Sequence, residues 1–181
     1  MRWLLPLLLA ASPALAQDLQ GNDTAGNWRV THHAIHDIWN VLCDEREEQG
    51  ALVQRCYIRY VDVFSPRPKF GGMFLFVTPE PKVDFGLEPG TLFLPGDFRI
   101  ENGGTVTWQT NRPGCLTGLS CTFEAEDAET LLQRMQDGGE MRFTFRDRHG
   151  QAQDLSWPLV GFPAALADYR AELGKRGLLD G

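Results

Sequence analysis

Hydrophobic and polar residues alternate in short runs along most of the chain. The alternation is regular in Met141–Arg146 (MRFTFR), where apolar side chains take every second position, a period typical of a half-buried β-strand. Trp39–Cys43 and Ala51–Phe64 are rich in β-branched and aromatic residues and also predict strands. Met73–Thr78 (MFLFVT) is apolar throughout, which predicts a strand buried on both faces. Further strand-length pieces, separated by Pro, Gly or polar residues, are 82–85, 91–94, 98–101, 105–110 and 119–125.

Two segments follow a helical period instead. One is Ala128–Gln136, with Asp127 as its N-cap and a Gly-Gly pair just after its end. The other is Pro163–Gly174, which has two leucines and a tyrosine on one face. Helices do not alternate with the strands, which disfavours a parallel α/β sheet. We therefore predict an all-β fold, a β-sandwich or partly closed barrel, with two short helices and disulfides that staple it.

Two polar segments are predicted to connect strands. Asp44–Gly50 is charged and predicts an exposed turn between the two strands beside it. Residues 65–72 (SPRPKFGG) contain two prolines and two glycines, which cannot form a regular ladder. Irregular loops on rigid β scaffolds often carry binding function. We therefore predict that Arg67, Lys69 and Phe70 form a possible interaction loop for a protein or envelope component.

The N-terminus has the three parts of a signal peptide. Arg2 supplies a positive charge, residues 4–11 form an apolar stretch, and Ala14–Ala16 has the small-x-small pattern of a cleavage site. We predict that residues 1–16 are removed before Gln17, and that the protein is periplasmic, secreted or attached to the cell envelope. No stretch of the mature sequence approaches the roughly 20 apolar residues that a membrane-spanning helix requires.

The mature chain is acidic. Loss of Arg2 leaves 16 of the 17 basic residues against 24 acidic ones, a net charge of −8. Such a chain repels phosphate backbones, so we expect no nucleic-acid partner. Residues 17–36 begin with a polar stretch rich in Gly and Asn and are predicted to be a flexible segment. Residues 37–181 are predicted to be one domain, whose oligomeric state the sequence does not give.

Export changes the interpretation of the four cysteines. In an oxidising compartment they predict two disulfides rather than a zinc site, and their spacing lacks the close pairs of zinc ligands. Four cysteines allow three pairings. We favour Cys43–Cys56 and Cys115–Cys121, because the two members of each pair are close along the chain.

Several motifs, taken in order, resemble those of one protein family. They are Trp39-x-x-x-Cys43, Cys56, Phe76–Pro79, Leu87–Gly90, Cys115 with Cys121, Ala128–Met135 and Leu155–Phe162. Together they cover residues 37 to 170 and resemble the invasion-associated locus B proteins, which are exported proteins of Gram-negative bacteria. Residues 65–72 and the histidine-bearing segment before Trp39 do not map onto that family.

The resemblance implies a disulfide-containing β-sandwich in the periplasm or at the cell envelope. The family's name refers to an association with host-cell invasion. The resemblance supplies no catalytic residues, so it implies a non-catalytic protein that acts through protein or envelope interactions.

The segment Thr31–Asp37 (THHAIHD) is the candidate metal site. His32 and His36 would share a face of a helix, His33 would lie beside His36, and Asp37 adds a carboxylate. Such donors suit zinc or copper. An exposed polar segment that leads into the first strand explains the pattern more simply, since the H-E-x-x-H motif is absent, so we expect no metal and no cofactor. A periplasmic metal-binding protein is the first alternative function.

A periplasmic hydrolase is the second alternative. The G-x-S-x-G turn of serine hydrolases is absent from the sequence, and Ser120 lies in the nearest similar stretch. His149, in a predicted turn, would have to act as the base. An acidic cluster also stands near the first predicted helix, where it is more simply explained by the helix dipole. Its members are Glu124, Glu126, Asp127 and Glu129. We therefore expect that the protein is not an enzyme.

Most aromatic residues are expected to fill the core rather than line a ligand pocket, because aromatic side chains dominate burial. Those considered are Tyr57, Tyr60, Phe70, Phe74, Phe76, Trp108 and Trp157.

Overall fold

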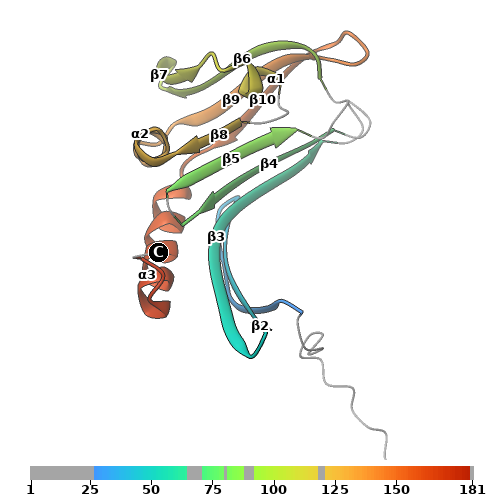
Figure 1. Ribbon diagram of the computed structural model, residues 1–181. Coiled ribbons are helices and arrows are strands. Elements are labelled where there is room, and N and C mark those ends of the chain that lie inside the picture. Colours follow the sequence, from blue (N-terminus) through green and yellow to red (C-terminus); the bar gives the residue numbers. More distant parts are fainter. Residues whose placement is uncertain (1–26, 65–70, 80, 88–91, 118–120, 180–181) are drawn as a thin grey trace, which may run out of the picture.

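Two antiparallel sheets and three helices make up the parts of the chain that this computed structural model describes, residues 27–64, 71–79, 81–87, 92–117 and 121–179. Sheet A has the strand order β1-β2-β3-β4-β5-β8, and sheet B has the order β10-β9-β6-β7 (Figure 1). The strands of sheet A are β1 (Arg29–His36), β2 (Trp39–Glu48), β3 (Ala51–Phe64), β4 (Gly71–Thr78), β5 (Lys82–Leu87) and β8 (Cys121–Glu124). Those of sheet B are β6 (Leu92–Asn102), β7 (Thr105–Thr110), β9 (Glu140–Asp147) and β10 (Ala152–Pro158). The helices are α1 (Pro113–Thr117), α2 (Ala125–Gln136) and α3 (Phe162–Arg176).

Aromatic side chains join the two sheets. Phe85 of β5 stacks on Phe98 of β6, with 4.4 Å between the ring centroids, and lies 5.5 Å from the ring of Phe143 in β9. Trp108 of β7 meets Phe123 of β8 edge-on at 5.4 Å. These contacts confirm the prediction of an all-β sandwich, and the alternation in Met141–Arg146 places its apolar face in this core.

Helix α3 packs on the first three strands of sheet A (Figure 1). Trp39 is fully buried, meets the ring of Phe162 edge-on at 5.0 Å, and donates a hydrogen bond from Nε1 to the carbonyl oxygen of Pro158 at 3.3 Å. Gly161 brings the start of α3 against the β1–β2 turn: a Cβ at this position would lie 2.3 Å from the carbonyl oxygen of His36. The start of α3 is therefore fixed to the first turn of the sheet.

Both predicted disulfides are present. Cys43 and Cys56 are direct cross-strand partners in β2 and β3. Cys115 in α1 is bonded to Cys121 at the start of β8. All four cysteines are buried in the core, so both disulfides join packed elements rather than exposed loops.

The N-terminal segment differs from its prediction. Residues 17–36 are predicted to be flexible, but Arg29–His36 form β1, which pairs along β2. Residues 17–26 and the predicted signal peptide lie outside the described residues. The sequence of β1 hides its strand character, because two of its covered positions carry histidines, whereas Val30 and Ile35 are exposed.

The predicted turn at Asp44–Gly50 is wrong, because β2 continues through Glu48 and the turn is confined to Gln49 and Gly50. Asp44 is only 4% exposed. Its carboxylate accepts hydrogen bonds from Nε of Arg55 at 2.6 Å and from Nη2 of Arg55 at 3.1 Å. A cross-strand partner thus satisfies a charge that indicates a loop when the sequence is considered alone.

The helices largely match their predictions. The one predicted at Ala128–Gln136 begins earlier, at Ala125, so Glu124 rather than Asp127 is the N-cap. The one predicted at Pro163–Gly174 is α3, and α1 is a third helix that the sequence did not indicate. None of the helices among the described residues has the length and hydrophobicity of a membrane span.

Candidate functional site

Two histidines of β1 face α3. In an extended strand alternate side chains point the same way, so His32, Ala34 and His36 share the covered face, whereas Thr31, His33 and Ile35 are exposed. The prediction of a shared face for His32 and His36 holds, but in a strand rather than a helix. A separation of four residues places two side chains on the same side in either structure.

A carboxylate of α3 lies between these two imidazoles. Oδ2 of Asp168 is 3.0 Å from Nε2 of His32 and 3.2 Å from Nε2 of His36. The small side chain of Ala34 separates the two histidines along the strand. The three polar side chains keep between 23% and 26% of their surface exposed, so solvent reaches the place where they meet.

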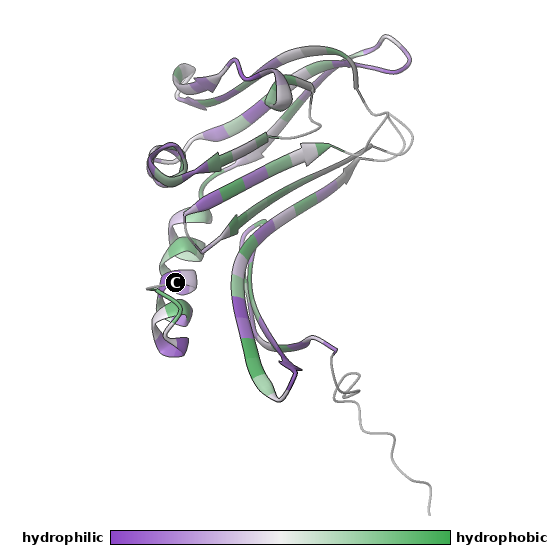
Figure 2. Ribbon diagram, viewed as in Figure 1, coloured by the Kyte–Doolittle hydropathy of each residue, from purple (hydrophilic) through white to green (hydrophobic). Residues whose placement is uncertain are grey.

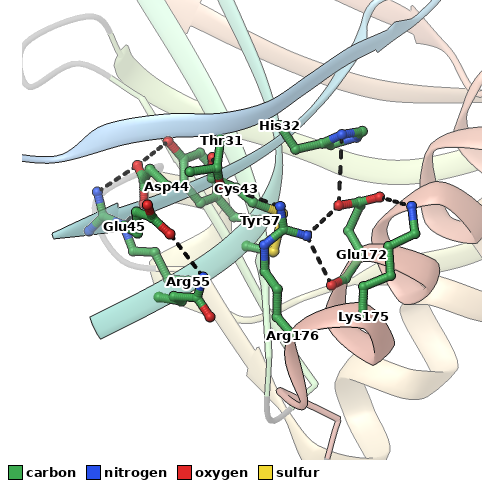
Figure 3. Close-up of a disulfide and its surroundings, with 12 residues drawn as sticks. Thr31, His32, Cys43, Asp44, Glu45, Arg55, Tyr57, Glu172, Lys175 and Arg176 are labelled. Atoms are coloured by element: carbon green, nitrogen blue, oxygen red, sulfur yellow. Dashed lines mark hydrogen bonds and ion pairs between the residues drawn. A yellow bond between two sulfur atoms is a disulfide. The ribbon is translucent and has the colours of Figure 1, made fainter. Parts of the chain in front are cut away.

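Glu172, one turn further along α3, completes a group that we call the histidine–carboxylate cluster: His32, His36, Asp168 and Glu172. Figure 3 shows Glu172 held by Lys175 and Arg176, with His32 on its other side. Oε2 of Glu172 is 3.8 Å from Nδ1 of His32. Glu172 is therefore a buried carboxylate, only 4% exposed, that faces the Nδ1 side of the His32 imidazole.

Hydrogen bonds and charge keep both carboxylates of the cluster ionised. Hydrogen bonds from Lys175 and Arg176 lower the pKa of Glu172 to about 2. For Asp168 burial acts to raise the pKa, but hydrogen bonds from His32 and His36 outweigh it, and the pKa is lowered overall. Ligand atoms of His32, Asp168 and Glu172 all lie within 4.8 Å of one another, an arrangement that can hold a metal ion.

The other two predicted metal ligands lie elsewhere. His33 is on the opposite face of β1, where Nε2 is 2.9 Å from Oδ1 of Asn40. Asp37 occupies the β1–β2 turn with a φ of 58°, and its Cβ faces Gly161. Neither belongs to the histidine–carboxylate cluster.

The face of sheet A that points away from the core carries a row of partly exposed aromatic and arginine side chains. We call this row the outer strip; it consists of Trp28, Arg46, Arg55, Tyr57, Phe74 and Phe76. Hydrophobic and hydrophilic stretches follow one another along β3 (Figure 2). The outer strip takes outward positions of β2, β3 and β4 together with Trp28 before β1.

Close ring contacts make the outer strip continuous. The guanidinium carbons of Arg55 and Arg46 lie 3.7 and 4.4 Å from the ring centroid of Trp28. The ring of Tyr57 is 6.1 Å from that of Phe76, which in turn is 5.8 Å from that of Phe74.

Phe74 covers a glycine of the next strand. A Cβ on Gly86 would lie 2.3 Å from Cζ of Phe74, so the ring rests on the backbone of β5. Phe74 is 39% exposed. The prediction that Met73–Thr78 is buried on both faces is therefore wrong, because sheet B and α3 cover only one face of sheet A. Phe74 is an exception to the expected burial of most aromatic residues.

The residues of the hydrolase alternative are not brought together among the described parts of the chain. His149 is exposed in the β9–β10 turn, where its backbone N–H donates to Oδ1 of Asp147 at 2.8 Å. Asp127 pairs with Arg112 at the start of α2. Ser120 lies outside the described residues.

The predicted interaction loop also lies outside the described residues, so the structure does not test Arg67, Lys69 and Phe70. In the sequence this loop joins β3 to β4, the two strands that carry Tyr57, Phe74 and Phe76.

Asp168 and Glu172 were missed by the sequence predictions. The sequence feature that could have revealed them is an acidic pair at i and i+4 on the predicted second helix, because this spacing places two side chains on a common face. That signal does not say which strand the face meets, because the partner histidines are more than a hundred residues away along the chain.

The fold and the site define a two-disulfide β-sandwich whose C-terminal helix closes a histidine–carboxylate cluster against its first strand. No protein-family model matches the sequence, and no curated protein matches it either. Among solved structures, the chain is similar to the crystal structure of invasion associated protein B from Bartonella henselae. The two share 15% sequence identity, with a TM-score of 0.49 and coverage of 80% of this chain and 99% of that chain.

Proposed function

We propose that this chain is an exported, non-catalytic protein that works by binding a protein partner through the outer strip. The observation that carries the proposal is the composition of this exposed face. Trp, Tyr, Phe and Arg are the residue types enriched at the centres of protein interfaces, whereas Lys and Glu are depleted there. Scattered single hydrophobic residues are normal on a surface, but a continuous row of rings is not.

The chemistry of the outer strip also indicates the kind of partner. The strip offers flat apolar rings beside the guanidinium groups of Arg46 and Arg55, and Arg59 pairs with Phe76 in the neighbouring strand. Arginine binds carboxylates in a bidentate manner and stacks on rings. Arg55 and Arg46 already pair with Asp44 and Glu48 of this chain, so the expected partner is a protein whose contact surface supplies mainly apolar side chains.

Three features of the chain support export. The predicted signal peptide precedes the domain, and disulfides such as Cys43–Cys56 persist in oxidising compartments. The ordered motifs that resemble the invasion-associated locus B proteins support the same location and a non-catalytic role at the envelope.

Replacing both Phe74 and Phe76 by serine is expected to weaken partner binding by at least 10-fold, because hot-spot side chains each contribute about 2 kcal/mol or more. Photo-crosslinking in a periplasmic extract would identify a partner, and titration with the purified partner would give the affinities. Circular dichroism would verify that the variant is folded.

The matched control replaces two exposed valines outside the outer strip, Val106 and Val160, by serine; they are 45% and 76% exposed. This control is expected to bind like the wild type. Equal binding by the Phe74→Ser/Phe76→Ser variant and the wild type would refute the proposal, and so would an equal loss in the valine control.

Export is tested separately by intact mass. Untagged protein from a periplasmic extract is expected to begin at Gln17, because the signal peptidase pattern ends at Ala16. Each disulfide removes two hydrogens, so the mass is expected to lie four hydrogens below that of the fully reduced chain. Uncleaved protein, or free thiols, would contradict export.

A further inference from the structure

We propose that a cavity between α2, α3 and the end of β4 binds a small aliphatic carboxylate, such as a free fatty acid of medium chain length. Figure 1 shows both helices at the end of sheet A where β4 finishes and β5 begins. The cavity lies on the covered face of the sheet, because Val77 of β4 lines it and is buried. The inference therefore does not depend on partner binding by the outer strip, which lies on the other face.

The size and position of the cavity suit a small molecule. Its volume is about 380 Å³, within the range of about 300–1,000 Å³ that is usual for ligand sites. One face of each helix lines it, at positions i, i+3, i+4 and i+7 counted from Glu129 in α2 and from Leu166 in α3. Leu166 is buried whereas Glu129 is exposed, so the cavity reaches from the core to solvent.

The inner part of the cavity is apolar. Leu132, Leu166 and Leu173 line it and are buried. After α3 the chain turns back, with the backbone N–H of Leu178 donating to the carbonyl oxygen of Leu173 at 2.9 Å, and Leu178 and Leu179 complete the lining on this side. Leucine side chains offer no hydrogen bonds, so this part of the cavity fits a hydrocarbon chain.

Tyr169 gives the apolar cavity an unused hydrogen-bond donor. The side chain lines the cavity and is buried, and its hydroxyl has no hydrogen-bond partner among the described residues. Burial raises the pKa of Tyr169, so the hydroxyl keeps its proton and can donate. A buried polar group without a partner is costly. A ligand oxygen in the cavity would supply the acceptor that this hydroxyl lacks.

Arg170, the next residue of α3, brings a positive charge to the same cavity. It is exposed and forms no ion pair with another residue in the described part of the chain. A guanidinium group binds a carboxylate through two parallel hydrogen bonds. Because Tyr169 and Arg170 both line the cavity, a carboxylate near this side of α3 has donors from both residues.

Glu129 sets the orientation of the ligand. It lines the cavity from α2, whereas Arg170 lines it from α3. A carboxylate is therefore repelled from the α2 side and attracted to the α3 side. A ligand with a positively charged end would meet the opposite field at Arg170 and would not use the hydroxyl of Tyr169 as a donor.

Isothermal titration of untagged, full-length mature protein at pH 7.5 tests the site with three molecules that share one alkyl chain: sodium octanoate, 1-octanol and octyltrimethylammonium bromide. One octanoate per chain is expected to bind. Octanol is expected to bind at least 10-fold more weakly, because hydrogen bonds to a charged group are stronger than those to a neutral one. No binding is expected for the ammonium compound. This comparison uses the wild type alone and does not depend on any variant folding.

Three variants assign the roles of the polar residues. Arg170→Gln is expected to weaken octanoate binding at least 10-fold and to leave octanol binding unchanged. Tyr169→Phe is expected to weaken octanoate binding about fivefold, while stability in urea without ligand is unchanged or higher, because an unpaired buried hydroxyl has been removed. Glu129→Gln is expected to strengthen octanoate binding, because a repelling charge is lost.

Arg134 provides the matched control, since it is an exposed arginine of α2 that does not line the cavity. Arg134→Gln is expected to bind octanoate like the wild type, and an equal loss of affinity in this control would overturn the proposal.

The absence of octanoate binding up to 5 mM would also overturn the proposal, and so would tighter binding of the ammonium compound. Unchanged octanoate affinity in Arg170→Gln would refute the role of this residue in the site. Tighter binding of the peptide N-acetyl-Ala-Ala-Leu than of octanoate would overturn the proposal too, because the cavity would then recognise the end of a polypeptide. None of these results would bear on partner binding by the outer strip.

Discussion

Replacing Gly161 by alanine is expected to lower the free energy of unfolding by about 3 kcal/mol, the upper end of the usual range for overpacking. The cost does not arise from the backbone of Gly161, whose φ of −82° any residue adopts. It arises because the new Cβ would lie 2.3 Å from the carbonyl oxygen of His36 and 2.7 Å from Cβ of Asp37. The start of α3 must then move, which separates Phe162 from Trp39.

Gly174 is the matched control in the same helix. A Cβ there would meet only Cδ1 of Leu179, at an ordinary 3.4 Å, and alanine favours the helix over glycine by about 1 kcal/mol. Gly174→Ala is therefore expected to leave stability unchanged or to raise it slightly. Urea unfolding followed by tryptophan fluorescence measures both variants. Equal stabilities for Gly161→Ala and the wild type would show that the close approach is not rigid.

Replacing Glu172 by alanine is expected to cost about 3 kcal/mol of unfolding free energy, because removing one partner of a buried ion pair leaves the other uncompensated. Arg176, with 14% of its side chain exposed, is the partner left behind, whereas Lys175, at 67%, reaches water. Arg176 also donates to Oγ1 of Thr31 at 3.3 Å. Glu172 thus joins the end of α3 to β1.

The pH dependence of this contribution has a definite sign. Hydrogen bonds from Lys175 and Arg176 lower the pKa of Glu172 from its ordinary 4.5 to about 2 in the folded protein. A carboxylate with a lowered folded-state pKa stabilises the fold fully above its unfolded pKa and loses this effect as the pH falls toward the folded value. The stability contributed by Glu172 is therefore present at neutral pH and is lost between about pH 4.5 and pH 2.

Comparison with Glu172→Gln isolates that titration from those of other carboxylates. The stability difference between the wild type and Glu172→Gln is expected to narrow as the pH is lowered from 7 to 3 in urea unfolding experiments. The exposed Glu129 serves as control, and Glu129→Gln is expected to change stability by less than about 0.5 kcal/mol. A difference that stays constant with pH would contradict the ionised state assigned to Glu172.

Most of the strands, though not β1 or β10, and both disulfides follow from local sequence features. Alternation in Met141–Arg146 fixes which side chains enter the core, and nearness along the chain selects the Cys43–Cys56 pair. These features are local because a strand's period and a hairpin's partner lie within a few residues.

What the sequence could not supply is which element covers which face. The apolar run of β4 is compatible with burial on one side or both, so the exposure of Phe74 was not predicted. The charge of Asp44 indicates a turn unless Arg55 is known to lie opposite. Both outcomes depend on tertiary packing, which overrides local preference.

The candidate site was predicted in part for the same reason. His32 and His36 were grouped correctly because four residues bring two side chains to one face in helix and strand alike. Asp168 joins them only once α3 has docked on β1. The sequence shows an acidic pair on a helix but does not show which strand that helix packs against.

The packing of α3 on the first three strands also sets an order of events during synthesis. A polypeptide emerges with its N-terminus first, and domains generally fold as units as they emerge. Here Trp39 and its strand neighbours are without their cover until Phe162 and the rest of α3 have emerged from the ribosome. For a chain exported as proposed above, we expect the domain to remain incompletely folded until α3 has been made, and to complete its fold only on the far side of the membrane.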